Sequence, residues 1–367
     1  MRLSRIGELN LLAEIRKRFS LKDGGVLVGI GDDAAVIAPP GRNILVTTDM
    51  MNEGVHFDTA FMSPFQLGFK LVSVNVSDIA AMGGEPKYLF LNLSLKQDAG
   101  EDCFRALFEG LSAAMEFYGV TLQGGDLSSS VNDMVVAATV MGLAENPVTR
   151  GGASAGDGIY VTSTLGDSAC GLEILKRLAR ESRGTVRGID FQGGVKEGRL
   201  ELDGCPEAWP ENWIDWKVAR PLLGRHLMPE ARDASGIAAK VSAMIDLSDG
   251  LFMDLSRLCD ESGTGARIYE ERIPVSAEMR SAAAEMGLDP MTLAVSGGED
   301  YELLFTAPPE AVVSGALPAG LFFGLKKTDS VSITRIGEVT EKERTVVGKD
   351  GMGHEMKREG YQHFGAP

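Results

Sequence analysis

The chain has 367 residues, of which 44% are hydrophobic and 24% charged, and its formal net charge is −16. Single hydrophobic cores stop growing at roughly 250–300 residues, so we expect two packed domains. The negative charge would repel nucleic acid, and it would also repel a phosphorylated ligand unless divalent cations stood between carboxylates and phosphates. We therefore expect no nucleic-acid partner, and any phosphate chemistry in this protein implies a metal.

No apolar stretch reaches the roughly 18 residues that a membrane span needs. The first 19 residues have helical periodicity with charges throughout, unlike a secretory signal. The four cysteines form no CxxC pair, which argues against a zinc knuckle or a disulfide framework. We expect a cytoplasmic protein with no membrane partner.

The first half of the chain is typical of one α/β unit. Strand-like runs occupy residues 26–30, 43–50, 88–95 and 134–144, and helix-like segments occupy residues 64–82 and 101–118. Pro64 suits a first helical turn, and Gly83 and Gly119 follow the expected helix ends. Residues 145–158 are rich in Pro, Gly and Ser, so we place the end of an N-terminal domain at residue 147.

Residues 148–367 mix helices and strands without a strict βαβ period, which favours an α+β domain. The patterns predict helices at 167–179, 229–240 and 251–263, strands at 158–164, 243–248 and 266–273, and a hairpin around 348–353. A polar insertion at about 181–217 ends in Trp209, Trp213 and Trp216 at helical spacing. A local packing face is the favoured interpretation of this stripe, and a lid over an aromatic substrate is the alternative.

One theme recurs six times along the chain: an acid beside Gly, Ser or Thr near the end of a predicted element. The motifs are GIGDD, TTD, VSD, GGD, IDLSDG and SGGED. Each alone fits ordinary turn or capping chemistry. Together they supply the oxygen donors that Mg²⁺ prefers, and six coincidences are hard to accept. We therefore predict that these acids meet at one site.

Asp78 is the most informative of these acids. Its helix, residues 64–82, is apolar nearly all round and so is expected to be buried, yet Asn75 and Asp78 share one face. A buried carboxylate needs a cation, a metal or strong donors. A structural salt bridge is the alternative to a metal here.

Two predicted helices begin beside acidic motifs, after residues 166 and 250, and would offer free N–H groups and positive dipole ends to anions. N-capping explains Ser248 and Asp249 without any ligand, but it does not explain Asp246, which closes a strand. The chain contains no GxxxxGK[ST] loop and no kinase HRD or DFG motif. The two familiar phosphoryl-transfer scaffolds are therefore excluded.

The order of the motifs resembles that of the thiamine-monophosphate kinase family. It runs GIGDD, TTD, EGVHF, VNVSDIAAMGGEP, GGD, GDSACGLEIL, RHLMP, IDLSDGL, SGGEDYELLF and the terminal GYQHF, from residue 29 nearly to the C-terminus. The resemblance implies the two-domain α+β (α/β) fold of aminoimidazole ribonucleotide synthetase, with N-terminal sheets that pair across a homodimer and an active site between the domains. It also implies ATP-dependent phosphorylation of thiamine monophosphate to thiamine diphosphate.

Carried over motif by motif, the resemblance implies a role for residues in both domains. Several Mg²⁺ ions would be held by Asp33, Thr47, Thr48, Asp49, Asp78, Asp126, Asp246 and Asp249. ATP would contact Gly125, Asp126, Arg150 and Ser248, and thiamine monophosphate would contact His56, Glu299 and Tyr361. The N-terminal domain, 1–147, would bind metal and ATP and mediate dimerisation, and residues 148–367 would complete the site.

No catalytic base is expected, because a phosphate monoester has a second pKa near 6 and is already ionised at neutral pH. Two alternatives stay open from the sequence: a sister ATP-using enzyme that acts on an amide, selenide or carbamoyl group, and a non-catalytic nucleotide sensor. The chain ends in HFGAP, without the terminal cysteine of hydrogenase-maturation relatives. Its first 29 residues also lack the cysteine that selenide chemistry would use.

Overall fold

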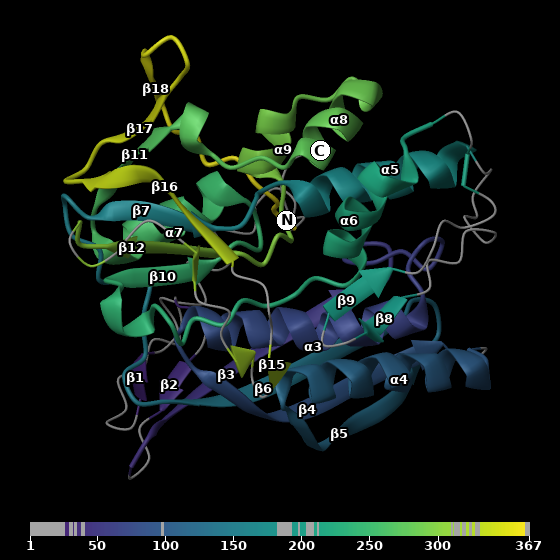
Figure 1. Ribbon diagram of the computed structural model, residues 1–367. Coiled ribbons are helices and arrows are strands. Elements are labelled where there is room, and N and C mark those ends of the chain that lie inside the picture. Colours follow the sequence, from purple (N-terminus) through teal and green to yellow (C-terminus); the bar gives the residue numbers. More distant parts are fainter. Residues whose placement is uncertain are drawn as a thin grey trace, which may run out of the picture.

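The computed structural model of the protein describes most of the chain. The described residues are 26–28, 32, 35–37, 41–96, 99–181, 193–196, 199–202, 209–210, 213–309, 311, 316–317, 321–322, 325–326 and 331–363. Within them the strands form a six-stranded sheet in the first half, an eight-stranded sheet in the second half, and two small hairpins (Figure 1). None of the described helices is long and apolar enough to cross a membrane.

The first sheet has the strand order β1-β2-β3-β6-β4-β5. Its strands are β1 (Val26–Val28), β2 (Ala35–Ile37), β3 (Asn43–Asn52), β4 (Glu85–Lys96), β5 (Thr121–Ser130) and β6 (Val135–Ala144). Only β4 and β5 pair in parallel among these strands. Buried and partly exposed residues alternate strictly along β6, because successive side chains point to opposite faces. One face of this sheet is therefore packed and the other is open.

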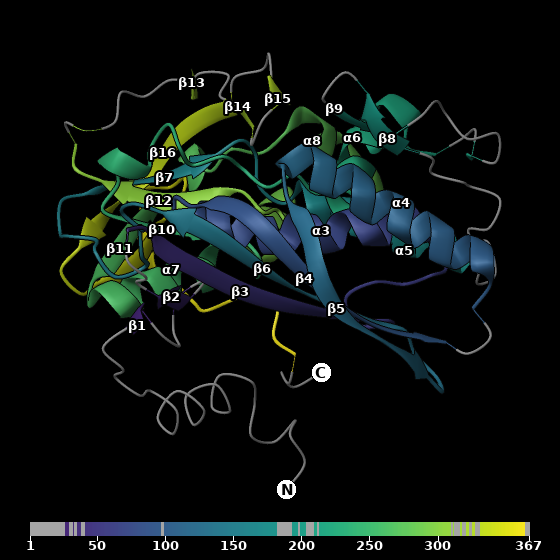
Figure 2. The same cartoon turned by 90° about the horizontal axis from the view of Figure 1, so that it is seen from below.

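Two helices cover the packed face, α3 (Pro64–Ala81) and α4 (Glu101–Tyr118) (Figures 1 and 2). A capping box between Ser63 and Gln66 starts α3, and left-handed Gly119, with φ 69°, ends α4. The helices touch backbone to backbone, since a Cβ atom at Gly110 would lie 1.9 Å from the carbonyl oxygen of Phe65. The predicted bounds of both helices are confirmed to within one residue.

The second sheet has the order β10-β12-β7-β16-β11-β17-β18, with β13 paired to β16. Its strands are β7 (Gly158–Thr162), β10 (Ala243–Asp246), β11 (Gly265–Tyr269), β12 (Leu303–Ala307), β13 (Ala316–Leu317), β16 (Val331–Thr340), β17 (Arg344–Val347) and β18 (Gly353–Glu355). The small hairpins are β8 (Gly193–Lys196) with β9 (Arg199–Leu202), and β14 (Leu321–Phe322) with β15 (Leu325–Lys326). The helices are α5 (Asp167–Glu181), α6 (Trp216–Leu227), α7 (Leu251–Ser262), α8 (Ala277–Met286) and α9 (Pro290–Ser296), with short 3₁₀ turns at Ala238–Lys240 and Glu270–Arg272.

Helix α3 joins the two halves of the molecule. It packs against β3, β4, β6 and α4 on one side and against β10 and α6 on the other (Figure 1). Tyr118 at the end of α4 adds a polar link, because its hydroxyl donates to Ser73 Oγ at 3.1 Å and accepts the N–H of Ala231 at 3.0 Å. The site-bearing face of α3 is thus held between both sheets.

The prediction of a helix at residues 229–240 is wrong. The helix in this region is α6, which ends at Leu227, and Pro229 follows it. Proline is favoured both in a first helical turn and just after a helix end, and the sequence pattern did not distinguish these two uses. Pro221 lies inside α6, and because proline is rare in a helix interior, the sequence pattern gave no prediction of this helix.

The tryptophans form a packing cluster, as predicted. The ring of Trp209 lies 5.5 Å from that of Trp213 and 5.0 Å from that of Trp216, measured between centroids. Trp209 is buried, and its indole N–H donates to the carbonyl oxygen of Ile214 at 2.9 Å. Most of the insertion around them lies outside the described residues.

The first prediction concerns the contact between α3 and α4. Gly110→Ala should lower the free energy of unfolding by about 2 kcal/mol or more, because the added methyl group meets backbone that cannot move alone. Gly224→Ala in α6 is the control: it has open space around the new Cβ and should be neutral or stabilising by up to about 1 kcal/mol. Urea denaturation measures both, and equal effects would contradict the close packing.

Candidate active site

Acidic motifs of the first sheet meet on α3. The Thr47 hydroxyl donates to Asp78 Oδ2 at 2.5 Å, and the Asp49 N–H donates to Asn75 Oδ1 at 3.1 Å. Asn75 is itself fixed by its amide, which donates to the carbonyl oxygen of Leu71 at 2.9 Å. The predicted common face of Asn75 and Asp78 is therefore the face against which the middle of β3 packs.

The second sheet reaches the same helix. The Ser77 hydroxyl donates to Asp246 Oδ2 at 2.6 Å, which attaches the end of β10 to α3. Burial and the nearby charge of Asp246 raise the pKa of Asp49 to about 6. Burial also raises the pKa of Asp78 well above its usual value, with Asp49 and Asp246 acting in the same direction. Carboxylates of both domains thus repel one another around α3.

This donor set fits Mg²⁺. Carboxylate and hydroxyl oxygens are the ligands that hard divalent cations prefer, and crowded carboxylates favour a cation between them. No group of three or more His, Cys, Asp or Glu side chains that could hold a metal ion occurs in the part of the chain that the structure describes.

The IDLSDG turn is held by an acid that the sequence analysis missed. Asp254 Oδ2 accepts the N–H groups of Ser248, Asp249 and Gly250 at 3.1, 2.9 and 3.1 Å. Asp254 therefore holds the turn that leads into α7, and Asp249 does not cap this helix, whose N-cap is Gly250 without a side-chain cap hydrogen bond. The Asp249 carboxylate instead lies 2.5 Å from Arg257 Nη1 at the mouth of the turn.

An acid distant in sequence also binds backbone N–H groups at the start of α5. Asp300 in the SGGED turn accepts the N–H of Gly166 at 2.6 Å and that of Ser168 at 3.3 Å. Burial raises the pKa of Asp300 to about 7, against the charge of Arg225. Two of the N–H groups at the start of this helix are thus satisfied within the chain. The sequence showed Asp300 in the SGGED motif but not this partner, because the two segments are distant in sequence.

Glu302 anchors the SGGED turn. Its buried carboxylate accepts two hydrogen bonds from Arg232, at 2.7 and 2.6 Å, and one from the Thr162 hydroxyl at 2.6 Å. Arg225 Nη2 lies 2.5 Å from the same carboxylate. The backbone of the turn also binds the IDLSDG motif, since Leu247 N–H donates to the Glu302 carbonyl oxygen at 2.8 Å.

The first sheet presents two of the predicted metal ligands on its open face. Asp126 on β5 pairs in register with Asn92, and both side chains are exposed. Thr48 is exposed too and lies between the core-facing residues Thr47 and Asp49. Thr48 and Asp126 therefore lie across the sheet from the carboxylate of Asp78.

Gly125 has a steric reason to be glycine. Its φ is 147°, and a Cβ atom there would lie 1.7 Å from the carbonyl oxygen of Leu91. Only glycine permits this conformation and this approach of two strands. The backbone beside Asp126 is thereby left bare of side chain.

Arg150, predicted to contact ATP, is held from the N-terminal half. The backbone N–H of Arg150 donates to Asp32 Oδ2 at 3.0 Å, and the side-chain Nε of Arg150 lies 3.7 Å from Asp32 Oδ1. Asp246 also attracts this guanidinium electrostatically. Asp33, the predicted ligand next to Asp32, lies outside the described residues.

The three residues predicted to contact the substrate lie near one another. The Tyr361 N–H donates to the Asp249 carbonyl oxygen at 3.0 Å, and the Glu299 N–H donates to that of Ser248 at 2.8 Å. His56 reaches the same region through His363 of the GYQHF motif. The Nε2 atom of His363 lies 3.4 Å from His56 Nε2, and its Nδ1 atom lies 3.4 Å from the Tyr361 hydroxyl.

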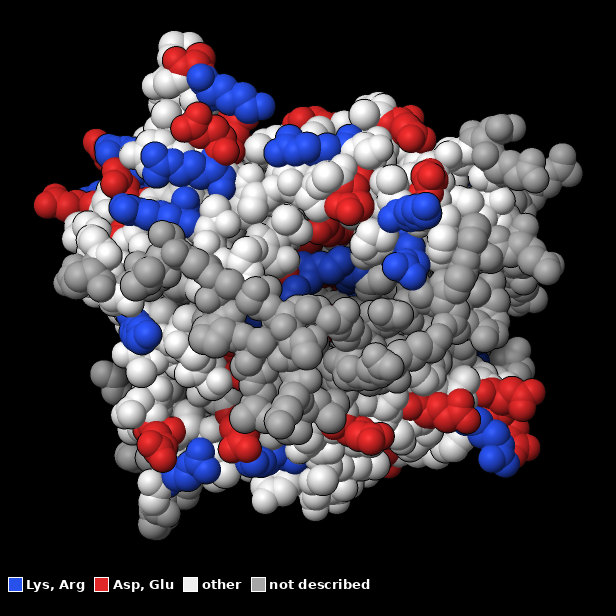
Figure 3. All heavy atoms as spheres, viewed as in Figure 1, with Lys and Arg blue, Asp and Glu red and all other residues white. Residues whose placement is uncertain are grey.

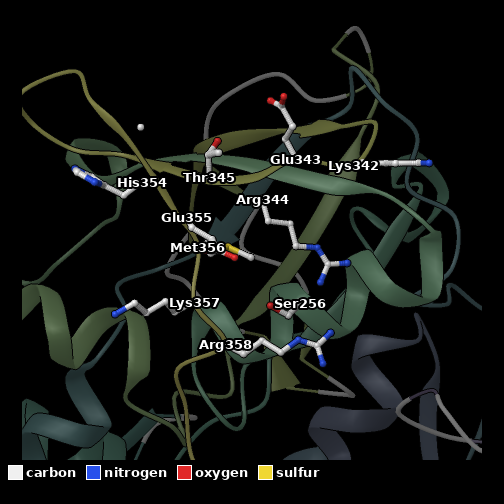
Figure 4. A pocket seen from close by; sticks show the side chains of 11 residues that line it. Ser256, Lys342, Glu343, Arg344, Thr345, His354, Glu355, Met356, Lys357 and Arg358 are labelled. Atoms are coloured by element: carbon white, nitrogen blue, oxygen red, sulfur yellow. The ribbon is translucent and has the colours of Figure 1, made fainter.

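The C-terminal segment that carries Tyr361 runs along α7. Arg344 and Arg358 both bind Asp260, which lies near the end of α7 distant from the active site. Gly360 packs at the other end, where a Cβ atom would lie 2.6 Å from the Asp249 carbonyl oxygen. Beside this segment lies a cavity of about 860 Å³ (Figure 4), whose lining includes Arg344 and Arg358.

Charges of both signs mix on the surface. On the described part of the face drawn in Figure 3, Lys and Arg side chains are interspersed with Asp and Glu.

Family models match both halves of the chain. Residues 31–144 match the model described as "AIR synthase related protein, N-terminal domain", and residues 154–350 match the corresponding C-terminal domain. With its two sheets and its acids at their junction, the molecule is an AIR synthase-related protein. The predicted two-domain α+β fold is confirmed.

Comparison with individual proteins identifies the family within the AIR synthase-related proteins. Thiamine-monophosphate kinase of Aquifex aeolicus is 32% identical over 366 residues, which cover 99% of this chain and 100% of that protein. The enzyme of Escherichia coli K12 is 34% identical, covering 98% and 99%. A solved structure of AaThiL complexed with AMPPCP and TMP is 32% identical, covers 99% of both chains and superposes with a TM-score of 0.78. This chain belongs to the thiamine-monophosphate kinase family, as its motifs predicted.

Hydrogenase maturation protein HypE shares the fold alone. Its structure in complex with HypF superposes with a TM-score of 0.64 at 18% identity, covering 95% of this chain and 99% of that chain.

The second prediction concerns Glu302. Glu302→Gln should lower the free energy of unfolding by about 3 kcal/mol or more, because it removes the charge that two mostly buried arginines share. Glu101→Gln is the control: its pair with Arg105 is exposed on both sides and should contribute less than about 1 kcal/mol. Urea denaturation separates the two, and a loss at Glu302 no larger than at Glu101 would contradict its role as an anchor.

Proposed function

We infer that this chain transfers the γ-phosphoryl group of ATP to the phosphate of thiamine monophosphate, giving thiamine diphosphate and ADP. The observation that carries this inference is the meeting of acidic motifs from both domains on α3, in a chain of this family. The AMPPCP and TMP of the related structure correspond to an ATP analogue and the acceptor.

The proposed Mg²⁺ ligands are the residues predicted from the motifs. They are Asp33, Thr47, Thr48, Asp49, Asp78, Asp126, Asp246 and Asp249. Thr48 and Asp126 lie on the open face of the first sheet, so they would hold an ion apart from Asp78. Several ions bound there would neutralise the phosphates of both substrates and so reduce their mutual repulsion. Asp78 is central to this proposal because its helix lies between the middle of β3 and the end of β10. Burial raises its pKa, and the charges of Asp49 and Asp246 act in the same direction.

The remaining residues bind and orient the two substrates. We propose that Gly125, Asp126, Arg150 and Ser248 contact ATP, with the bare backbone at Gly125 approaching its phosphates. Thiamine monophosphate contacts His56, Glu299 and Tyr361 at the mouth of the same site.

The transfer needs no general base. An oxygen of the acceptor phosphate attacks the γ-phosphorus in line, the bond from that phosphorus to the bridging oxygen breaks, and ADP leaves with the electron pair. The attacking oxygen is already ionised at neutral pH, so no proton must be removed first. We propose direct transfer without a phosphoenzyme, in which alignment supplies most of the rate.

We also propose a homodimer formed through the open face of the first sheet. Met50 and Tyr88 on this face are 56% and 45% exposed, and Met141 lies beside Tyr88 in the register. A second copy of the same face is self-complementary in a two-fold dimer, and burying these side chains stabilises it. The N-terminal domain would then combine dimerisation with metal and ATP binding. Because ATP is the co-substrate, we place the protein in the cytoplasm.

The activity is tested by incubating the protein with ATP, Mg²⁺ and thiamine monophosphate, followed by detection of thiamine diphosphate and ADP. An aminoimidazole precursor replaces the acceptor in a parallel reaction. We expect product only with thiamine monophosphate. Product only with the precursor would identify a sister enzyme, and nucleotide binding without product would identify a sensor.

The third prediction concerns Asp78. Asp78→Asn should reduce kcat more than about 100-fold, because it removes charge from the centre of the proposed metal site, while the circular dichroism spectrum stays unchanged. Asp102→Asn, in the exposed first turn of α4, is the matched control and should retain full activity. Near-normal turnover of the Asp78 variant would remove this residue from the metal site.

The fourth prediction concerns the dimer. Tyr88→Glu places a charge in the open sheet face and should shift sedimentation from dimer to monomer. Phe104→Glu changes another exposed aromatic residue, 37% exposed on α4, and should leave the dimer intact. A wild-type protein that sediments as a monomer at all concentrations would contradict the proposed pairing.

A further inference from the structure

Lys70 on α3 is a buried lysine to which neither the motifs nor the proposed mechanism gives a role. Its side chain is 0% exposed, and its Nζ lies 3.0 Å from Glu299 Oε1. Among the described atoms, none accepts a hydrogen bond from this Nζ with good geometry. An ammonium group carries three donors, and burying it with a single ionic partner is expensive. Packing alone does not account for a lysine at this position.

Glu299, the partner of Lys70, is held in an unusual conformation. Its φ is 66°, which is uncommon for a residue other than glycine and is typical of constrained functional positions. Its second oxygen, Oε2, lies 3.2 Å from His226 Nδ1 on α6. Lys70 from the first half of the molecule and His226 from the second thus hold one carboxylate between them.

Lys70 and Glu299 differ in how far each side chain is exposed to solvent. Glu299 is 26% exposed and can meet a ligand, whereas Lys70 is fully covered and cannot. The substrate proposed above carries a positively charged thiazolium ring and an aminopyrimidine amine, and both interact favourably with an ionised carboxylate. An inner cation that keeps an outer carboxylate ionised suits this substrate.

We propose that Lys70 is a positioning residue that keeps Glu299 ionised and directed towards the cationic thiamine moiety of the substrate. The proposal rests on the function proposed above. Lys70 acts through Glu299 and does not touch the substrate, so it governs affinity for thiamine monophosphate and not for ATP.

The charged and titratable groups that face Glu299 are Lys70 on α3, His226 on α6, and His56 and Tyr301 nearby. Burial acts to raise the pKa of Glu299, but Lys70 and then His226 lower it below its usual range. Burial lowers the pKa of both histidines, so neither replaces the fixed charge of Lys70 near neutral pH. Without Lys70 only the contact with His226 opposes the effect of burial, so Glu299 takes up a proton more readily as the pH falls.

The test compares the wild-type enzyme with Lys70→Met and Lys70→Arg between pH 5.5 and 8.5. The measured quantity is the KM for thiamine monophosphate of each variant divided by that of the wild type, because the ratio cancels the titration of the substrate phosphate. For Lys70→Met we expect this ratio to grow roughly tenfold or more from pH 8.5 to 5.5, with the KM for ATP changed less than about twofold. Lys70→Arg keeps the charge and should give a flat ratio.

The second part of the test measures the same KM values for the Glu299→Gln variant. This variant cannot ionise, so its KM should be raised by the same factor at every pH, and adding Lys70→Met should raise it no further. If Lys70→Met does not fold by circular dichroism, Lys70→Gln takes its place with the same expectation. A pH-independent ratio, or equal increases in both KM values, would overturn the role of Lys70 while leaving the kinase activity of the wild type intact. An inactive wild type would instead overturn the proposed function.

Discussion

Repulsion between carboxylates at the junction of the two sheets is the constraint on which this structure depends. Asp49 and Asp246 come from different sheets, and both add to the effect of burial in raising the pKa of Asp78 on the helix between them. Two carboxylates about 5 Å apart at an effective dielectric near 20 repel by roughly 3 kcal/mol. In a chain with a net charge of −16, such a junction calls for cations, and two polyanionic substrates need the same cations before they can approach each other.

The protein uses its other acids to build the frame around this junction. Asp254 binds the turn before α7, Asp300 binds two N–H groups at the start of α5, and Glu302 is satisfied by two arginines and a threonine. All three are buried and have protein partners. Some of the proposed metal ligands have protein partners too, since Asp249 pairs with Arg257 and Asp78 accepts a hydrogen bond from Thr47. Neither burial nor pairing alone therefore distinguishes a structural acid from a functional one, and the proposed ligands stand out because carboxylates of both sheets gather around Asp78.

Much of this arrangement could be predicted from the sequence because its signals are local. Pro64 marks the start of α3, and Gly119 marks the end of α4. Asp78 lies on an apolar helix, and this pattern predicts a buried carboxylate that needs a cation or a hydrogen-bond donor. The roles of Asp254 and Asp300 could not be predicted, because each satisfies backbone groups whose position depends on the tertiary fold. The face on which Asp126 lies depends on the register of β5 with β4, and Lys70 looked like one polar residue on a long apolar helix.

The central claim is that acids distant in sequence gather divalent ions between two phosphorylated substrates. A crystal structure with Mn²⁺, a non-hydrolysable ATP analogue and thiamine monophosphate tests it most directly, because the anomalous signal of manganese locates each ion. The account predicts anomalous peaks within coordination distance of Asp78 and at least one of Asp49 and Asp246, between the phosphates of the two ligands. Bound ligands whose only manganese peaks lie away from these carboxylates would contradict it.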